Sequence, residues 1–200
     1  MFTIEQAKKE LEIAVQNNPG PWEQHSLVTA HNARAIAEKV PGMDPEKAYI
    51  MGLLHDIGRR EGITGMRHVI DGYDYLMSLG QPELAVICLT HSYATQNAMH
   101  FEGKHDCTPE QMAFIQRFLE THEYDDYDKL IQLCDAISLP QGACIMEKRF
   151  VDVALRYGVQ DYTLQRWRAY IRWKKYFDDL CGCDLYTLLP SVYENSIANL

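Results

Sequence analysis

A histidine and an aspartate stand side by side at His55 and Asp56, directly after the apolar residues Leu53 and Leu54 and shortly before Gly58. Imidazole nitrogen and carboxylate oxygen are both common ligands of divalent transition metals. The apolar run before the pair is typical of a helix buried in a protein core, and the glycine is typical of a helix end. Together these residues predict a metal site at the end of a core helix.

Further residues of the same ligand types lie next to apolar residues at helical spacing or near expected helix ends. His25 lies upstream of the pair, and His68, His91 and Asp135 lie downstream. Asp135 is the most informative, because it lies on the apolar stripe of its helix, where an unpaired charge is costly. A lone buried aspartate is more often a salt-bridge partner or an acceptor of backbone N–H. Here the histidines also need an explanation, so a metal site is the better interpretation.

The other histidines are expected outside the site. His31 lies about 240° around its helix from the first candidate ligand and should face solvent. His122 is expected at the surface near a helix end, and so are His100 and His105 in an irregular segment, where they could contact a substrate through a lid. The second His-Asp pair, His105 and Asp106, follows Glu-Gly-Lys instead of an apolar run, so we do not predict a metal site there.

The length and composition fit one domain that can fold without disulfide bonds. A chain of 200 residues and 23.1 kDa should bury roughly 70% of its unfolded surface and needs no structural metal. A bound metal would therefore serve chemistry. The net charge of −9 and the pI of about 5.3 disfavour a nucleic-acid polymer as a partner, because no stripe of Lys and Arg offsets the acidic runs.

The six cysteines show no CxxC spacing, so we expect free thiols. Cys181 and Cys183 could in principle bind a metal or form a strained redox pair, but no second Cys or His pair lies nearby. The N-terminus lacks the charged and apolar regions of a signal peptide, and no segment is apolar enough to cross a bilayer. We therefore expect a soluble cytoplasmic protein that does not bind membranes.

The periodicity predicts an all-α, single-domain bundle of roughly 8–10 helices, since no useful alternating strand pattern is present. Capping boxes at Thr3 and Thr108 mark two helix starts, and Gly58 is expected to end the helix that carries the His-Asp pair. The irregular segment 92–107 is long enough to suggest a functional lid. Helices are expected at about residues 3–17, 22–40, 45–56, 66–79, 82–90, 108–124, 130–139, 143–157 and 163–180, with a short one after Asp184.

These residues give the chain a resemblance to the HD-domain superfamily of metal-dependent phosphohydrolases, whose hallmark is an early His, a His-Asp pair and a later Asp. The resemblance covers residues 22–139 and includes the HDIG signature at residues 55–58, with His25 placed 30 positions before His55 (55 minus 25). It implies an HD-type helical domain, 1–200, on whose core the helices of 143–200 pack. The superfamily motif does not describe the residues beyond Gly142.

The resemblance also implies a binuclear site. His68 and His91 look like the two extra histidines of the branch that includes dinucleoside polyphosphate hydrolases and HD-GYP phosphodiesterases, although the GYP part is absent. His25, His55, Asp56 and Asp135 would hold one ion, and His68 and His91 a second, with Asp56 bridging. One or two ions are implied, and nitrogen-rich ligation without thiolate suits Fe, Mn, Co, Ni or Zn.

Basic residues near the motif are candidates for binding phosphate. Arg59 and Arg60 follow the His-Asp pair and, with Asp56, are the candidate catalytic residues; Arg67 precedes His68. Such a charged loop is often simply solvated. Lys104 and Arg149, with its neighbour Lys148, are weaker candidates of the same kind, and Trp22, Tyr73, Tyr75 and Tyr93 could stack on a base, although aromatic residues at helical spacing more often belong to a core.

The candidate ligands and the family resemblance are compatible with three functions. The first is hydrolysis of a phosphate ester or anhydride in a small, nucleotide-like molecule by a metal-activated water. The second is a mixed-valent di-iron oxygenase, because HD-type oxygenases share the six-ligand pattern. The third is a module that binds nucleotide or metal without catalysis. The sequence leaves self-association open.

Overall fold

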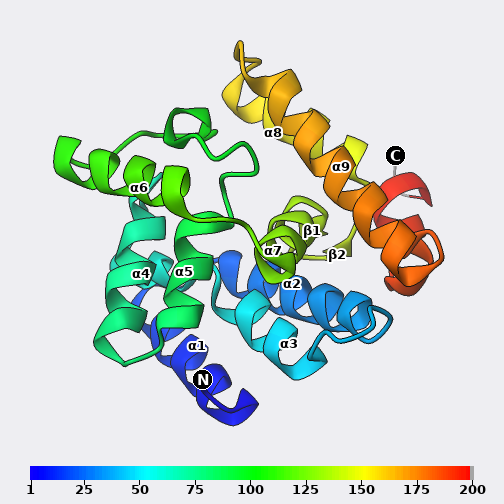
Figure 1. Cartoon of the computed structure of the whole chain (residues 1–200), viewed down its shortest axis with the longest axis horizontal. Helices are drawn as coiled ribbons and strands as arrows, with labels where there is room; N and C mark the ends of the chain where they lie inside the picture. The colour runs from blue at the N-terminus through cyan, green and yellow to red at the C-terminus, as the bar shows by residue number, and fades with distance from the viewer. Residues whose placement is uncertain (199–200) are drawn as a thin grey trace.

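The computed structural model describes residues 1–198 and is almost entirely helical (Figure 1). The predicted all-α fold is confirmed. The helices and strands are α1 (Ile4–Asn17), α2 (Trp22–Ala37), α3 (Pro45–Leu54), η1 (Ile57–Glu61), α4 (Arg67–Ser78), α5 (Pro82–Thr90), η2 (Ala98–His100), α6 (Pro109–Thr121), α7 (Asp126–Ala136), β1 (Ser138–Leu139), β2 (Gly142–Ala143), α8 (Met146–Tyr157), α9 (Thr163–Cys181), η3 (Leu185–Leu188) and η4 (Glu194–Ala198).

Helices α2 and α3 cross at close range and carry two of the candidate ligands to one place. A Cβ atom on Gly52 would lie 2.8 Å from the Cα atom of Ala30, so glycine is what allows the two backbones to approach. Asp44 caps the start of α3 by accepting hydrogen bonds from two backbone N–H groups, and Pro45 occupies the first turn. This crossing places the first turn of α2 near the end of α3.

Helices α4 and α5 form a hairpin that supplies two further histidines. Gly80 ends the first helix with a φ of +68°, a left-handed conformation that glycine adopts without strain. Pro82 starts the second helix, as predicted. A small apolar cluster joins this hairpin to α6 through Met66, Val69, Leu89, Phe101, Ile115 and Leu119. The segment that contains Phe101 is therefore anchored beside the hairpin.

Helix α7 lies in the centre of the molecule and α9 packs beside it (Figure 1), while α8 lies against α9, where the rings of Phe150 and Trp167 stack. Phe150 of α8, and Ala169, Tyr170 and Phe177 of α9, belong to the same apolar cluster as residues of α1, α2 and α3. A short antiparallel hairpin, β1–β2, connects α7 to α8. Helices α8 and α9 therefore pack on the core that carries the candidate ligands.

Several local expectations were wrong. Helix α6 ends at Thr121 and not near residue 124, and α7 spans Asp126–Ala136, followed by strand β1, where one helix was expected over residues 130–139. Helix α2 ends at Ala37 and not near residue 40. Gly58 does not end α3, which stops at Leu54, four residues earlier; it lies inside η1. Its role is close packing, because a Cβ atom there would lie 2.0 Å from the carbonyl oxygen of His68 and 2.4 Å from the nitrogen of Gly72.

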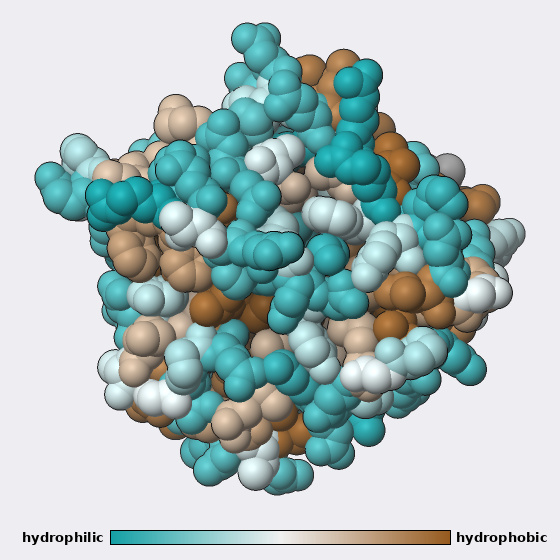
Figure 2. Space-filling model, in the orientation of Figure 1, coloured by the Kyte–Doolittle hydropathy of each residue, from teal (hydrophilic) through white to brown (hydrophobic). Residues whose placement is uncertain are grey.

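The face seen in Figure 1 is largely hydrophilic, with apolar residues between the polar ones (Figure 2). Among residues 1–198, no helix combines the length and apolar composition needed to span a membrane.

Candidate metal centre

The six candidate ligands come from five helices and meet in the interior. His25 lies in the first turn of α2, His55 and Asp56 follow α3, His68 lies in the first turn of α4, His91 follows α5, and Asp135 lies near the end of α7. Helix ends suit this purpose, because two neighbouring residues can turn toward one point there. His55, Asp56, His68 and His91 are each at most 3% exposed.

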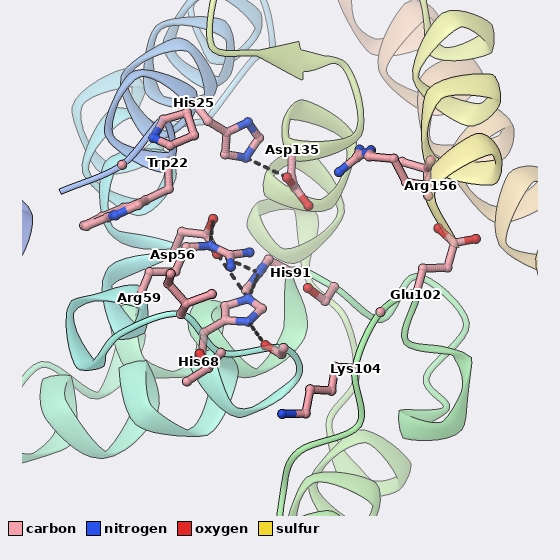
Figure 3. Close-up of a pocket in the computed structure, with 18 of the residues that line it drawn as sticks. Trp22, His25, Asp56, Arg59, His68, His91, Glu102, Lys104, Asp135 and Arg156 are labelled. Carbon is pink, nitrogen blue, oxygen red and sulfur yellow. Dashed lines mark hydrogen bonds and ion pairs between the residues drawn. The ribbon is translucent and has the colours of Figure 1, made fainter. Parts of the chain in front are cut away.

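The side chains form two groups joined by Asp56 (Figure 3). In the first group, Nε2 of His25 lies 2.9 Å and Nε2 of His55 lies 3.9 Å from Oδ1 of Asp135. In the second, Oδ1 of Asp56 lies 3.1 Å from Nε2 of His68 and 3.6 Å from Nε2 of His91. The second carboxylate oxygen, Oδ2 of Asp56, lies 3.8 Å from Nε2 of His55. All six predicted ligands are therefore brought together.

The backbone fixes the proton positions on three of the histidines. Their Nδ1 atoms lie within hydrogen-bond distance of carbonyl oxygens, which only accept, so Nδ1 carries a proton, and in the neutral form of each ring Nε2 keeps a lone pair. The contacts are His55 to Gly52 (2.7 Å), His68 to Gly65 (2.6 Å) and His91 to Cys88 (2.9 Å).

Four of the six residues, His55, Asp56, His91 and Asp135, have pKa shifts that favour the ionisation states that a metal requires. Burial lowers the pKa of His55 and lowers that of His91 to about 3. Burial alone would raise the pKa of Asp56, but Arg59 and His55 outweigh it and hold this pKa well below its usual range. The pKa of Asp135 is also lowered, because His25 outweighs the effect of burial. Neutral imidazoles and ionised carboxylates are the ligand forms of these residues.

Unpaired polar atoms in the site also indicate a metal ion, independently of the sequence motif. The buried atoms Nε2 of His55 and Oδ1 of Asp56 have no hydrogen-bond partner within the part of the chain that the structure describes. Since buried polar atoms are nearly always satisfied, these two call for a partner. Two sets of ligand atoms lie within 4.8 Å of one another and could hold an ion, namely His25, His55 and Asp135, and His55, Asp56 and His91.

The three predicted arginines near the motif have different environments. Arg59 donates from Nε to Oδ2 of Asp56 at 2.6 Å and lines the cavity beside the ligands. Arg60 stacks on Tyr75, with its guanidinium carbon 3.7 Å from the ring centroid. Arg67 pairs with Asp71 at 2.9 Å. The cavity lining includes neither Arg60 nor Arg67, so the structure does not place these two predicted residues at the site.

The ligands open into a cavity of about 860 Å³. Lys104 and Arg149, both predicted from the sequence, line its walls. Glu102, Arg156 and Arg166 also line it and were not predicted. Arg156 belongs to α8 and Arg166 to α9. The sequence does not indicate which side of these helices faces the cavity, because the rest of the cavity is formed by elements distant in the chain. Of the four aromatic candidates, Trp22 lines the cavity, while Tyr73, Tyr75 and Tyr93 do not.

The irregular segment 92–107 forms one wall of the cavity and is tied to α9. Arg166 is buried and donates to the carbonyl oxygen of His100 at 2.5 Å. Tyr162 donates to the carbonyl oxygen of Phe101 at 3.0 Å, and its ring stacks on His100. The segment expected to act as a lid is thus held in place by the C-terminal helices, with Glu102 and Lys104 turned to the cavity (Figure 3).

The remaining histidines lie outside the candidate centre. His31 and His105 are exposed, as expected. His122 is only half-buried at the end of α6, and its Nε2 lies 2.8 Å from Oδ2 of the buried Asp128. Asp106, beside His105, is no metal ligand here; its carboxylate accepts hydrogen bonds from backbone N–H groups at the start of α4.

A family model described as HD domain matches residues 22–139, more than half of the chain. The chain belongs to the HD domain family, whose members are generally metal-dependent hydrolases. Searches of curated proteins and of solved structures give no match. The family match ends with β1, so α8 and α9, which supply Arg149, Arg156 and Arg166, lie beyond it.

Proposed function

We propose that the protein is a metal-dependent phosphohydrolase that cleaves a phosphate ester or anhydride in a small, nucleotide-like molecule. The observation that carries this proposal is the convergence of six N and O ligands on a cavity that is lined by arginines. Ligands of this type bind transition metals, and arginine is the side chain best suited to phosphate.

We further propose that the site holds two ions. His25, His55, Asp56 and Asp135 would hold one ion, and His68 and His91 would hold the other, with Asp56 shared between them. The support for two positions is that each oxygen of Asp56 faces different histidines. When bound, such ions supply Lewis acidity and a water of lowered pKa. Fe, Mn, Co, Ni and Zn all suit these ligands.

The protein's own residues hold and orient these groups. The carbonyl oxygens of Gly52, Gly65 and Cys88 fix three imidazoles with Nε2 toward the site. Arg59 holds the Asp56 carboxylate with Nε, and its two terminal nitrogens have no hydrogen-bond partner among the described residues. Those nitrogens are free to bind an oxygen of the phosphate that is attacked.

A small phosphorylated molecule fits this site better than a polymer. A cavity of about 860 Å³ lies within the range of small-molecule sites, and the net charge of −9 opposes binding of a long polyanion. The indole of Trp22 lines the cavity, and its Nε1 donates to the carbonyl oxygen of Asn18 at 2.9 Å. A ring fixed in this way can support a nucleotide base. A cytoplasmic location stays a prediction from the sequence, and self-association stays open.

The test has three measurements. Elemental analysis of gently purified protein should find transition metal, and the metal-loaded protein should release phosphate or nucleotide from members of a panel of monoesters, diesters and anhydrides. Asp56→Ala should abolish turnover, whereas Asp161→Ala, at an exposed position, should not.

Two other functions would give different results. Iron alone, with substrate-dependent oxygen uptake and no phosphate release, would favour the oxygenase. Saturable nucleotide binding without turnover, whichever metal is loaded, would favour a binding module.

A further inference from the structure

Two arginines of α8 share one carboxylate on the cavity wall. The Oδ2 atom of Asp152 accepts hydrogen bonds from Nη1 of Arg149 at 2.7 Å and from Nη2 of Arg156 at 2.9 Å. The three residues are spaced by three and four positions, which places them on one face of the helix. One carboxylate cannot neutralise two guanidinium groups, so this part of the wall keeps a positive charge.

Arg149 and Arg156 have further N–H donors that Asp152 does not use. All three residues line the cavity. The side chain of Arg149 is only 18% exposed, and its Nε is buried without a hydrogen-bond partner among residues 1–198. Leaving a buried charged donor unpaired is costly, and an anionic ligand would satisfy it. Asp152 holds the two guanidinium groups next to each other, so little side-chain entropy remains to be lost when they bind a ligand.

These arginines are separate from the one that serves the ligand cluster. Arg59 already donates to Asp56, whereas no hydrogen bond or ion pair in the described residues joins Arg149 or Arg156 to any of the six ligands. Figure 3 shows Arg156 extending from α8 into the space that His25, Asp56 and His68 face from the other side. The cavity therefore has positive charge on two opposite walls.

We propose that Arg149 and Arg156 form an anion subsite for a second phosphate group of the substrate, remote from the phosphate that is attacked. This inference rests on the proposed function and narrows it. The substrate class is a molecule with two phosphate groups far enough apart to reach both walls, and a nucleoside monophosphate lacks the second group. Because α8 lies beyond the family match, this preference belongs to this chain's own C-terminal region.

Phosphate is the anion that the subsite fits best. Guanidinium groups present parallel donors that match the oxygen atoms of a phosphate group. Lys104 also lines the cavity and adds a further positive charge to it. A single carboxylate group would leave most of these donors unused.

Binding measurements test the subsite independently of turnover. The metal-loaded chain is titrated by calorimetry with adenosine 5′-monophosphate, adenosine 3′,5′-bisphosphate and ATP. At least one of the two multiply phosphorylated probes should bind more tightly than the monophosphate. Arg149→Gln and Arg156→Gln should each weaken the binding of that multiply phosphorylated probe by about tenfold. The binding of the monophosphate should change much less.

The variants are chosen so that misfolding does not imitate the result. Arg156 is 47% exposed, so Arg156→Gln should leave the fold intact, which circular dichroism would check. Arg168→Gln, at an exposed position on α9 outside the cavity, is the matched control and should bind all three probes as the wild type does.

Three outcomes would overturn the subsite: neither multiply phosphorylated probe binds more tightly than the monophosphate, the α8 variants weaken all probes equally, or they weaken none. An arginine-dependent advantage without hydrolysis of any phosphate compound would reject the proposed function and retain the subsite.

Discussion

The Nε2 atoms of His68 and His91 lie 3.2 Å apart, the separation of a hydrogen bond. A hydrogen bond requires a proton between them, but in the neutral form of both rings, the form that binds a metal, the proton is on Nδ1, where it is donated to a carbonyl oxygen. Two lone pairs therefore face each other in a buried site. This arrangement is unfavourable by itself and becomes favourable when a cation compensates the lone pairs.

Removal of metal should therefore destabilise the protein. A ligand at about 100 times its Kd stabilises the folded state by about 2.7 kcal/mol. For a chain of this length, each kcal/mol shifts the Tm by about 2–4 °C, so chelation should lower the Tm by roughly 5–10 °C. Thermal melts before chelation, after chelation and after readdition of Mn²⁺ or Zn²⁺ measure the effect.

A matched pair of histidine variants separates binding at this site from general effects of metal. His68→Ala should lose most of the metal-dependent shift, whereas His31→Ala, at an exposed position, should keep it. A Tm that does not respond to chelator in the metal-loaded wild type would contradict the interpretation of the facing lone pairs.

Arg59 should matter for activity far more than its neighbour Arg60. Arg59→Lys removes the planar group that donates to Asp56 at 2.6 Å, and loss of such a partner of a metal ligand typically reduces metal affinity or activity by about 10–100-fold. Arg60→Lys changes a side chain that stacks on Tyr75 outside the cavity, so turnover should stay within about twofold. Steady-state kinetics on one active phosphate substrate measures both, and equal losses would contradict the difference in roles.

Local signals in the sequence were sufficient for most helix starts. The capping boxes at Thr3 and Thr108 are present, with both reciprocal hydrogen bonds. The end of α3 was misplaced because glycine has two uses in a helical protein, ending a helix and allowing close packing. The residues that contact Gly58 lie 10 and 14 positions later in the chain (68 − 58 and 72 − 58), so a local pattern cannot distinguish these uses.

The ligands were easier to predict than the rest of the cavity. Each ligand is a polar residue in an apolar context, which is a local anomaly that a sequence displays. Arg156 and Arg166 lie on helices with many charged residues, and nothing local distinguishes them from Arg168 or Arg172, which are exposed. Their contribution depends on how α8 and α9 are placed on the core, which is set by contacts between residues far apart in the sequence.

Gly58→Ala should unfold or strongly destabilise the protein. The added Cβ would meet backbone atoms of α4 at 2.0 and 2.4 Å, so the helix that carries His68 would have to move. Overpacking of this kind costs about 1–3 kcal/mol or more. Gly42→Ala is the control: Gly42 has a φ of +84° and open space around it, so the cost should be about 1 kcal/mol from backbone strain alone. Urea denaturation compares the two, and equal losses would show that the contact at Gly58 is easily relaxed.

Asp106 should stabilise the start of α4 in a pH-dependent way. Its carboxylate accepts from backbone N of Gly65 at 2.7 Å and of Arg67 at 2.9 Å. Burial opposes ionisation, but these hydrogen bonds outweigh it and lower the pKa of Asp106 below its ordinary value of 3.8. A carboxyl group whose pKa is lower in the folded state contributes stability above the unfolded-state pKa and loses it as the pH falls through the folded-state pKa.

Asp106→Asn should therefore cost about 1 kcal/mol at pH 7, and the difference from wild type should shrink as the pH falls below 3.8. Urea denaturation at pH 7, 5 and 3 measures this difference, with Asp161→Asn at an exposed position as the control. A difference that stays constant down to pH 3 would show that the charge of Asp106 does not act on the folded state. Because α4 carries His68, the same variant should also weaken metal binding, which links a residue of the irregular segment to the candidate metal centre.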